Sequence, residues 1–205
     1  MFYWFFIFLI GFGLFLAVSN FLRELQYSKK SITDYAKSIK FDYLRDLDIE
    51  TKARLADFKS LENIDLSTSW NAMEGTYHGF SWKIFNCSSI DSNDNASKSS
   101  QTIILARVSD MNFPRLLINF KYHWLRTSFE KNINTDGTSV EGEKLITSSL
   151  VRLFSKIKYP AVIEVYADGF VYYRKNRKIH PKNLEALLKE GSQFLGVLKD
   201  SFLGI

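Results

Sequence analysis

The sequence predicts an α+β protein in which an N-terminal transmembrane helix is followed by an antiparallel sheet with helices packed on one face. Three observations lead to this prediction. Residues 1–22 form a charge-free apolar run, two later segments have the pattern of β-hairpins, and the chain ends in an amphipathic helix. Because the hairpins and helices do not alternate as strand-helix-strand units, an antiparallel rather than a parallel sheet is expected.

Residues 1–22 predict a membrane anchor. As a helix rising about 1.5 Å per residue, the run spans roughly 30 Å, the thickness of the hydrocarbon core. The alternative is a cleaved secretory signal, for which Ala17-Val18-Ser19 is a tolerable site. A signal has a positively charged start and a shorter apolar run, and this sequence has neither. We therefore expect a retained single-pass anchor.

The charges that flank the anchor predict its orientation. Arg23, Lys29 and Lys30 follow it, whereas only the terminal amine precedes it. Cytoplasmic flanks carry the excess of Lys and Arg, so the C-terminal domain is expected in the cytoplasm. The single cysteine, Cys87, precludes an intramolecular disulfide, in keeping with a reducing compartment.

Three regions are expected: the anchor at 1–22, a helical juxtamembrane connector at 23–65 and an α+β domain at 66–205. In the connector, a helix is predicted from Arg23 to Lys40 and a short strand at 41–44. A second helix is predicted from an Asp48 cap to about Leu61. Its apolar face is expected to hold Ile49, Ala53 and Ala56.

The first predicted hairpin turns at His78-Gly79, after which Phe80, Trp82 and Ile84 alternate with less apolar positions. The Ser/Asn/Asp-rich segment 88–100 predicts a loop between paired strands. Further strands are predicted at 101–109 and 115–122, with a turn at 132–138.

The last third of the chain predicts a helix, a hairpin and a helix. Residues 143–158 place apolar side chains on one helical face. The hairpin at 162–173 has Asp168-Gly169 as an expected type I′ turn. Pro181 then opens the final helix, at 183–202, whose apolar stripe is expected to cover the sheet.

Gly75-x-Tyr77-x-Gly79 leads to Ile84-Phe85, and a strand begins at Gln101-Thr102. Together with the order of elements, these residues resemble a loose group of uncharacterised bacterial membrane-anchored proteins, which have one N-terminal transmembrane helix and an α+β domain of unknown function. The resemblance implies a location in the bacterial inner membrane. It supplies no functional residues.

Four residues are the obvious candidates for catalysis or metal binding: His78, His123, His180 and Cys87. Their spacing contains no His-x-x-x-His, Cys-x-x-Cys or Glu-x-x-His pair, so no metal and no cofactor is expected. A Cys-His nucleophile pair stays open as an alternative, because such partners meet in space rather than in sequence.

The formal net charge is +5, and one segment, 174–182, holds as many cations as the whole surplus. One interpretation is a solvated strand edge, where Lys and Arg discourage pairing between sheets. A second is contact with anionic lipid headgroups or a partner. Nucleic acid is the weaker third, because it usually requires a broader basic surface. The candidate contact residues are Arg174, Lys175, Arg177, Lys178 and Lys182.

These features predict a membrane-anchored, non-enzymatic scaffold or accessory subunit that presents a cytoplasmic α+β domain to a protein partner. The alternative is a membrane-tethered enzyme with a site built from scattered polar residues. An enzyme is expected to bring several of the His, Cys and buried carboxylate side chains together in one pocket.

Overall fold

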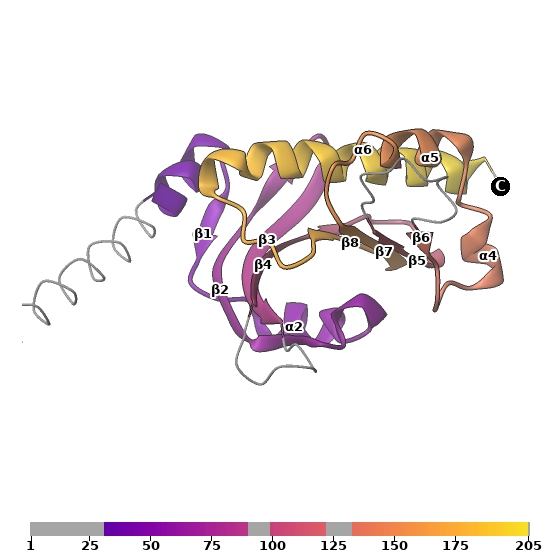
Figure 1. Cartoon of the computed structure of the whole chain (residues 1–205). Helices are drawn as coiled ribbons and strands as arrows, with labels where there is room; N and C mark the ends of the chain where they lie inside the picture. The colour runs from indigo at the N-terminus through magenta and orange to yellow at the C-terminus, as the bar shows by residue number, and fades with distance from the viewer. Residues whose placement is uncertain (1–30, 90–98, 122–132, 205) are drawn as a thin grey trace, which may run out of the picture.

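The computed structural model describes residues 31–89, 99–121 and 133–204, and its elements surround one eight-stranded antiparallel sheet (Figure 1). The strand order is β1-β2-β3-β4-β8-β7-β5-β6. The strands are β1 (Asp42–Leu44), β2 (Ile64–Tyr77), β3 (Phe80–Ser89), β4 (Ser99–Arg107), β5 (Phe113–Phe120), β6 (Ile133–Asn134), β7 (Ala161–Ala167) and β8 (Gly169–Arg174). The predicted α+β class and antiparallel sheet are confirmed.

The helices lie on both faces of this sheet (Figure 1). They are α2 (Ile49–Leu55), α4 (Val140–Glu143), α5 (Ser148–Phe154) and α6 (Leu184–Leu203), with 3₁₀ turns η1 (Lys59–Leu61) and η2 (Pro181–Asn183). Helices α5 and α6 cover one face, whereas α2 and η1 cover the other. The expectation that all helices pack on one face is therefore wrong.

Both predicted hairpins are present and belong to the same sheet. The β2–β3 turn places His78 at φ 48° and Gly79 at φ 79°, the left-handed conformations that a two-residue turn requires. Strand β3 pairs with β4, so the strands that flank residues 90–98 are neighbours, as expected. Strand β4 lies between the two hairpins, because it pairs with β3 on one side and with β8 on the other.

The β7–β8 turn differs from the prediction by one residue. Tyr166 pairs with Gly169, so the turn residues are Ala167 and Asp168, and Ala167 takes φ 51°. Gly169 is needed for another reason. A Cβ atom there would lie 2.6 Å from the Phe58 ring, because that ring packs directly over the strand. The Asp-Gly pair thus indicated the hairpin correctly but not its turn residues.

Helix α6 packs across the sheet as predicted. Leu187, Leu195 and Leu198 are fully buried against the face that carries Trp82 and Tyr172. Burial of each such side chain contributes roughly 1.5–3 kcal/mol, so this helix is a major part of the core.

Helix α2 begins at the predicted Asp48 cap, whose Oδ1 accepts a hydrogen bond from Thr51 N at 2.7 Å. It ends at Leu55 rather than near Leu61, and its expected apolar face is wrong: Ile49 is 87% exposed. The buried side chains are Leu55, Phe58 and Leu61, which pack on the sheet. Their larger apolar areas outweigh those of two alanines, so the chain turns them inward.

The helix predicted at 143–158 is confirmed only in part: α5 covers 148–154, and α4 ends at Glu143, where the predicted helix begins. Thr147 caps α5, with its Oγ1 accepting from Leu150 N, so a new helix starts there. Capping side chains favour such breaks over a continuous helix. Leu150 and Phe154 are nevertheless buried on the predicted face.

Part of the expected connector belongs to the folded body. Residues 31–38 are helical, with Ile32 and Ala36 buried in the α6 core, and β1 pairs with β2. In residues 31–89, 99–121 and 133–204, no helix combines the length and apolar character needed to cross a membrane. The predicted anchor, residues 1–22, lies outside the described residues.

Candidate functional site

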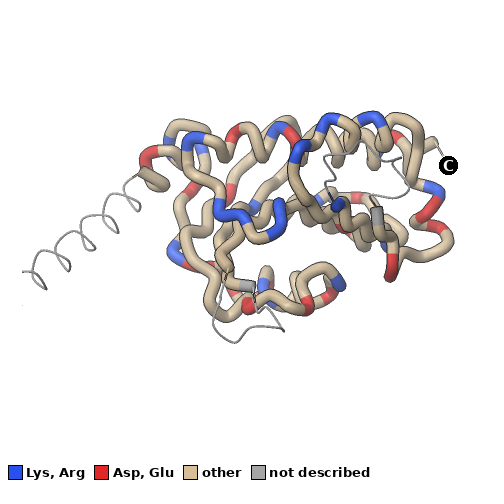
Figure 2. Tube along the Cα trace, viewed as in Figure 1, with Lys and Arg blue, Asp and Glu red and all other residues tan. Residues whose placement is uncertain are grey.

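The basic run lies on the segment that joins β8 to α6, which we call the basic connector (residues 174–182). Figure 2 shows Lys and Arg along it without an acidic position. Hydrogen bonds hold its backbone to the sheet: Lys175 N donates to Pro160 O at 3.1 Å, and Arg177 O accepts from Thr102 N at 3.0 Å. Ile179 N donates to Thr102 Oγ1 at 2.8 Å. The connector is therefore a fixed surface segment.

Edge protection does not explain these cations. Strand β8 lies between β4 and β7, so it is an interior strand whose backbone groups are paired on both sides. Lys and Arg discourage association at exposed sheet edges, and β8 has no such edge. That interpretation of the basic run is wrong.

Arg174 differs from the other four cations because it is internally paired. Its Nη2 lies 2.8 Å from Glu190 Oε2, and only 16% of its side chain is exposed. The same carboxylate accepts a short hydrogen bond that the Tyr172 hydroxyl donates. Burial raises the pKa of Tyr172, and the negative charge of Glu190 raises it further. Arg174 therefore ties β8 to α6 and is not a free contact residue.

The other cations of the connector are exposed. The Arg177 guanidinium lies 4.2 Å from the centre of the Tyr159 ring, and that of Arg174 lies 4.9 Å from it. Lys175, Lys178 and Lys182 are also exposed. Lys175 as a residue is exposed, but partial desolvation of its ammonium group lowers its pKa, and the positive charge of Lys121 lowers it further. The structure thus places four of the five predicted residues where a ligand can reach them.

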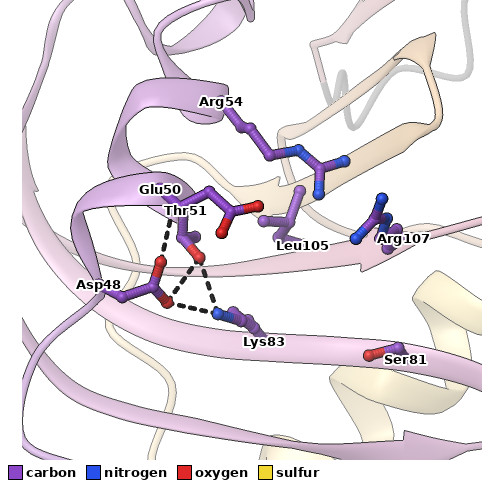
Figure 3. Close-up of a pocket in the computed structure, with 8 residues that line it drawn as sticks. All are labelled: Asp48, Glu50, Thr51, Arg54, Ser81, Lys83, Leu105 and Arg107. Atoms are coloured by element: carbon purple, nitrogen blue, oxygen red, sulfur yellow. Dashed lines mark hydrogen bonds and ion pairs between the residues drawn. The ribbon is translucent and has the colours of Figure 1, made fainter.

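A charged cleft of about 280 Å³ lies on the face of the sheet that α2 covers, between α2 and strands β3 and β4 (Figure 3). Lys83 Nζ is 2.5 Å from Asp48 Oδ2, 3.3 Å from Glu74 Oε2 and 2.7 Å from Thr51 Oγ1. Arg54 and Arg107 share Asp168, at 2.5 and 3.0 Å. The cleft is lined by Asp48, Glu50, Thr51, Arg54, Ser81, Lys83, Leu105 and Arg107.

The charged groups of the cleft shift one another's pKa values. Burial alone lowers the pKa of Lys83, but hydrogen bonds and charge from Asp48 and Glu74 outweigh it and raise that pKa above its usual value. The Lys83 hydrogen bond in turn holds the pKa of Asp48 far below its usual range. A cationic Lys83 cannot accept a proton from Thr51. The Thr51 hydroxyl donates to Asp48 Oδ2 at 2.8 Å, and the lowered pKa of that carboxyl makes it a weak base. The contacts fasten α2 to β3.

Of the candidate catalytic residues, the three in the described part of the chain, His78, Cys87 and His180, form no hydrogen bond with one another. Cys87 is fully buried at the far end of β3 from His78, which lies in the β2–β3 turn and stacks on Tyr77. Burial raises the pKa of the Cys87 thiol to about 12. His180 is exposed and caps η2. His123 lies outside the described residues.

One functional-looking residue was missed by sequence reasoning. Glu164 is fully buried, and its carboxylate accepts hydrogen bonds from the backbone N–H groups of Lys59 at 3.1 Å and Ser60 at 2.8 Å. Arg115 Nε lies 3.7 Å from it. These contacts dock η1 on the sheet. Within the described parts of the chain, no three His, Cys, Asp or Glu side chains are grouped so that they could hold a metal ion.

Comparison with known proteins finds no matching family model and no matching curated protein. Among solved structures, the chain is similar to the crystal structure of the mycobacterial trehalose monomycolate transport factor A, TtfA. The TM-score is 0.53 with 12% sequence identity, over 83% of this chain and 93% of that chain. At this identity the likeness concerns the fold alone.

Proposed function

We propose that this chain is a membrane-anchored, non-enzymatic scaffold or accessory subunit of the bacterial inner membrane, whose cytoplasmic α+β domain binds a protein partner. The observation that carries the proposal is the position of the first buried residues in the described part of the chain. Ile32 and Ala36 are 3% and 0% exposed in the α6 core, and Ile32 follows Leu22 by ten residues. Ten residues reach at most about 35 Å, so an anchored domain would stay beside the bilayer.

The flanking charges support a cytoplasmic domain. Arg23, Lys29 and Lys30 follow the apolar run, and the terminal amine alone precedes it. The positive-inside rule favours cytoplasmic retention of that flank. Cys87, the one cysteine of the chain, is a buried free thiol, which suits a reducing compartment.

The charged cleft and the positions of the His and Cys side chains favour an interaction role over catalysis. The charged cleft contains ion pairs that fasten α2, and the His and Cys candidates described here are separated. The alternative remains an enzyme whose site is the charged cleft, because Arg54, Lys83 and Arg107 converge there. A shared fold with TtfA, which is named as a transport factor, supports seeking the partner first among membrane transport proteins.

The proposal is tested by affinity purification of the full chain from detergent-solubilised membranes, followed by mass spectrometry. We expect one protein to co-purify at a fixed stoichiometry. A matched control carries the same tag on residues 1–40 fused to an unrelated soluble protein, and it should lose that partner. Recovery of the full chain alone would contradict the proposal.

The enzyme alternative predicts a different result for the cleft. Lys83→Met and Arg107→Gln should leave the co-purified partner unchanged if the domain is an interaction module. If these variants abolish the cellular role while leaving folding and the partner intact, the cleft is an active site and the non-enzymatic proposal is wrong.

A further inference from the structure

The register of the sheet brings a second basic segment beside the connector. Phe120 of β5 pairs with Ala161 of β7, and Ala161 pairs with Arg174 of β8, so these residues form one row across three strands. Extending this register by one residue places Lys121, Pro160 and Lys175 in the next row, and Lys175 N donates to Pro160 O at 3.1 Å. Neighbouring strands lie about 4.8 Å apart, which places the two lysine backbones roughly 10 Å apart.

Tyr159 stands at the centre of this end of the sheet. It precedes Pro160, is 37% exposed, and lies under the guanidinium groups of Arg177 and Arg174. Lys158 is exposed beside it. We call this group the Tyr159 surface; it consists of Lys121, Lys158, Tyr159, Lys175 and Arg177.

The cations of the Tyr159 surface come from segments without acidic residues. No Asp or Glu occurs at 144–163 or at 169–184. The Glu190 carboxylate pairs with Arg174 and also accepts a hydrogen bond from the Tyr172 hydroxyl. Partial burial lowers the pKa of Lys175, and the positive charge of Lys121 lowers it further, which indicates that these two ammonium groups lie close to each other. Like charges gathered in this way favour an anionic ligand.

We propose that the Tyr159 surface binds the phosphate groups of anionic lipid headgroups in the bilayer that holds the anchor. The inference rests on the proposed membrane-anchored function and names the lipid contact of that domain. Basic residues near a membrane are attracted to anionic headgroups, and a tyrosine ring with a polar tip suits the headgroup region. Two guanidinium groups already lie over the Tyr159 ring, so it is not a free stacking platform for nucleobases.

The test uses the full chain inserted in lipid nanodiscs and hydrogen-deuterium exchange read by mass spectrometry. In discs that contain phosphatidylglycerol, exchange in residues 156–159 and 175–178 should be several-fold slower than in discs of phosphatidylcholine alone. The difference should shrink in 1 M salt, where the Debye length falls to about 3 Å. Equal exchange in both kinds of disc would overturn the inference.

Variants locate the effect. Replacing Lys121, Lys158, Lys175 and Arg177 together with Gln should remove the slowing by anionic lipid, while Arg174 stays in place to pair with Glu190. The matched control should keep the slowing of exchange by anionic lipid. It replaces four other exposed cations with Gln: Arg45, Lys144, Arg152 and Lys189. A fourfold Tyr159-surface variant that keeps the lipid effect contradicts the inference. If that variant loses exchange protection in α6, the single changes Lys175→Gln and Arg177→Gln replace it, and each should reduce the effect.

Two further outcomes separate the sources of phosphate. Inorganic phosphate or a single-stranded oligonucleotide, added to phosphatidylcholine discs, should not slow exchange in these segments; slowing by either would overturn the lipid assignment. Failure of the chain to insert in discs would count against the membrane-anchored function itself. Insertion without a lipid effect would count against the Tyr159 surface alone.

Discussion

The Arg174 guanidinium of β8 lies 2.8 Å from the Glu190 carboxylate of α6, at Nη2–Oε2, with 16% and 24% of the two side chains exposed. This pair joins the central part of the sheet to the helix that covers it. The pair also distinguishes Arg174 from the other cations of the basic connector, because the Arg174 guanidinium is already paired with a carboxylate of the domain.

Loss of the Arg174–Glu190 pair should destabilise the domain. Arg174→Gln leaves a partly buried Glu190 charge without its cation, and hydrogen bonds to charged groups contribute about 1.5–3 kcal/mol. We expect a loss of about 1–3 kcal/mol in thermal unfolding of the full chain in mild detergent. Lys178→Gln, on the exposed connector, is the control and should change stability by less than about 0.5 kcal/mol.

Two glycines of α6 offer a matched test of its packing. A Cβ atom at Gly191 would lie 2.3 Å from Ile104 Cδ1, whereas one at Gly196 would meet nothing within 4 Å. Gly191→Ala should cost about 1–3 kcal/mol through overpacking. Gly196→Ala should stabilise by about 0.5–1 kcal/mol, because alanine favours helix. Equal effects on the unfolding midpoint would show that α6 does not pack on the sheet as described.

The Asp48–Lys83 pair should make stability depend on acid pH. Because the pKa of Asp48 is lowered on folding, its charge stabilises the fold above the ordinary pKa of about 3.9 and that contribution is lost as pH falls below it. Asp48→Asn keeps a good helix cap and removes the charge. Urea unfolding should show the variant about 0.5–1 kcal/mol less stable at pH 7, with the difference shrinking below pH 4. A constant difference at all pH values would contradict the pairing.

The buried Cys87 thiol should be chemically silent in the folded protein. It is fully buried, and burial raises its pKa to about 12, so little reactive thiolate forms at pH 8. A chromogenic disulfide reagent should react with one thiol per chain in denaturant and with almost none before unfolding. Rapid reaction under native conditions would mean that Cys87 is accessible and would reopen a nucleophilic role.

Local chemistry in the sequence was enough to predict the hairpins and α6. His78-Gly79 and the alternation through Trp82 and Ile84 act over a few residues, and the final helix repeats leucine at helical spacing. These patterns depend only on residues that are close in the sequence, so they can be recognised without knowing the tertiary structure.

Contacts between residues that are far apart in the chain could not be predicted from local sequence patterns. Phe58 is turned inward because it packs over Gly169, which is more than a hundred residues away in the chain. Glu164 reads as a surface acid in a strand, yet it is buried under η1. Lys121 joins the basic connector only through the order of β5, β7 and β8. Each of these depends on strand order, which local patterns do not determine.

The most direct test of the membrane-anchored account is protease protection of the full chain, carrying a C-terminal epitope, in bacterial spheroplasts. We expect the epitope in the membrane fraction, intact when protease is added outside and digested only after the membrane is permeabilised, because the flank after residue 22 is basic. Digestion in intact spheroplasts, or a mature chain that begins at Asn20, would contradict it.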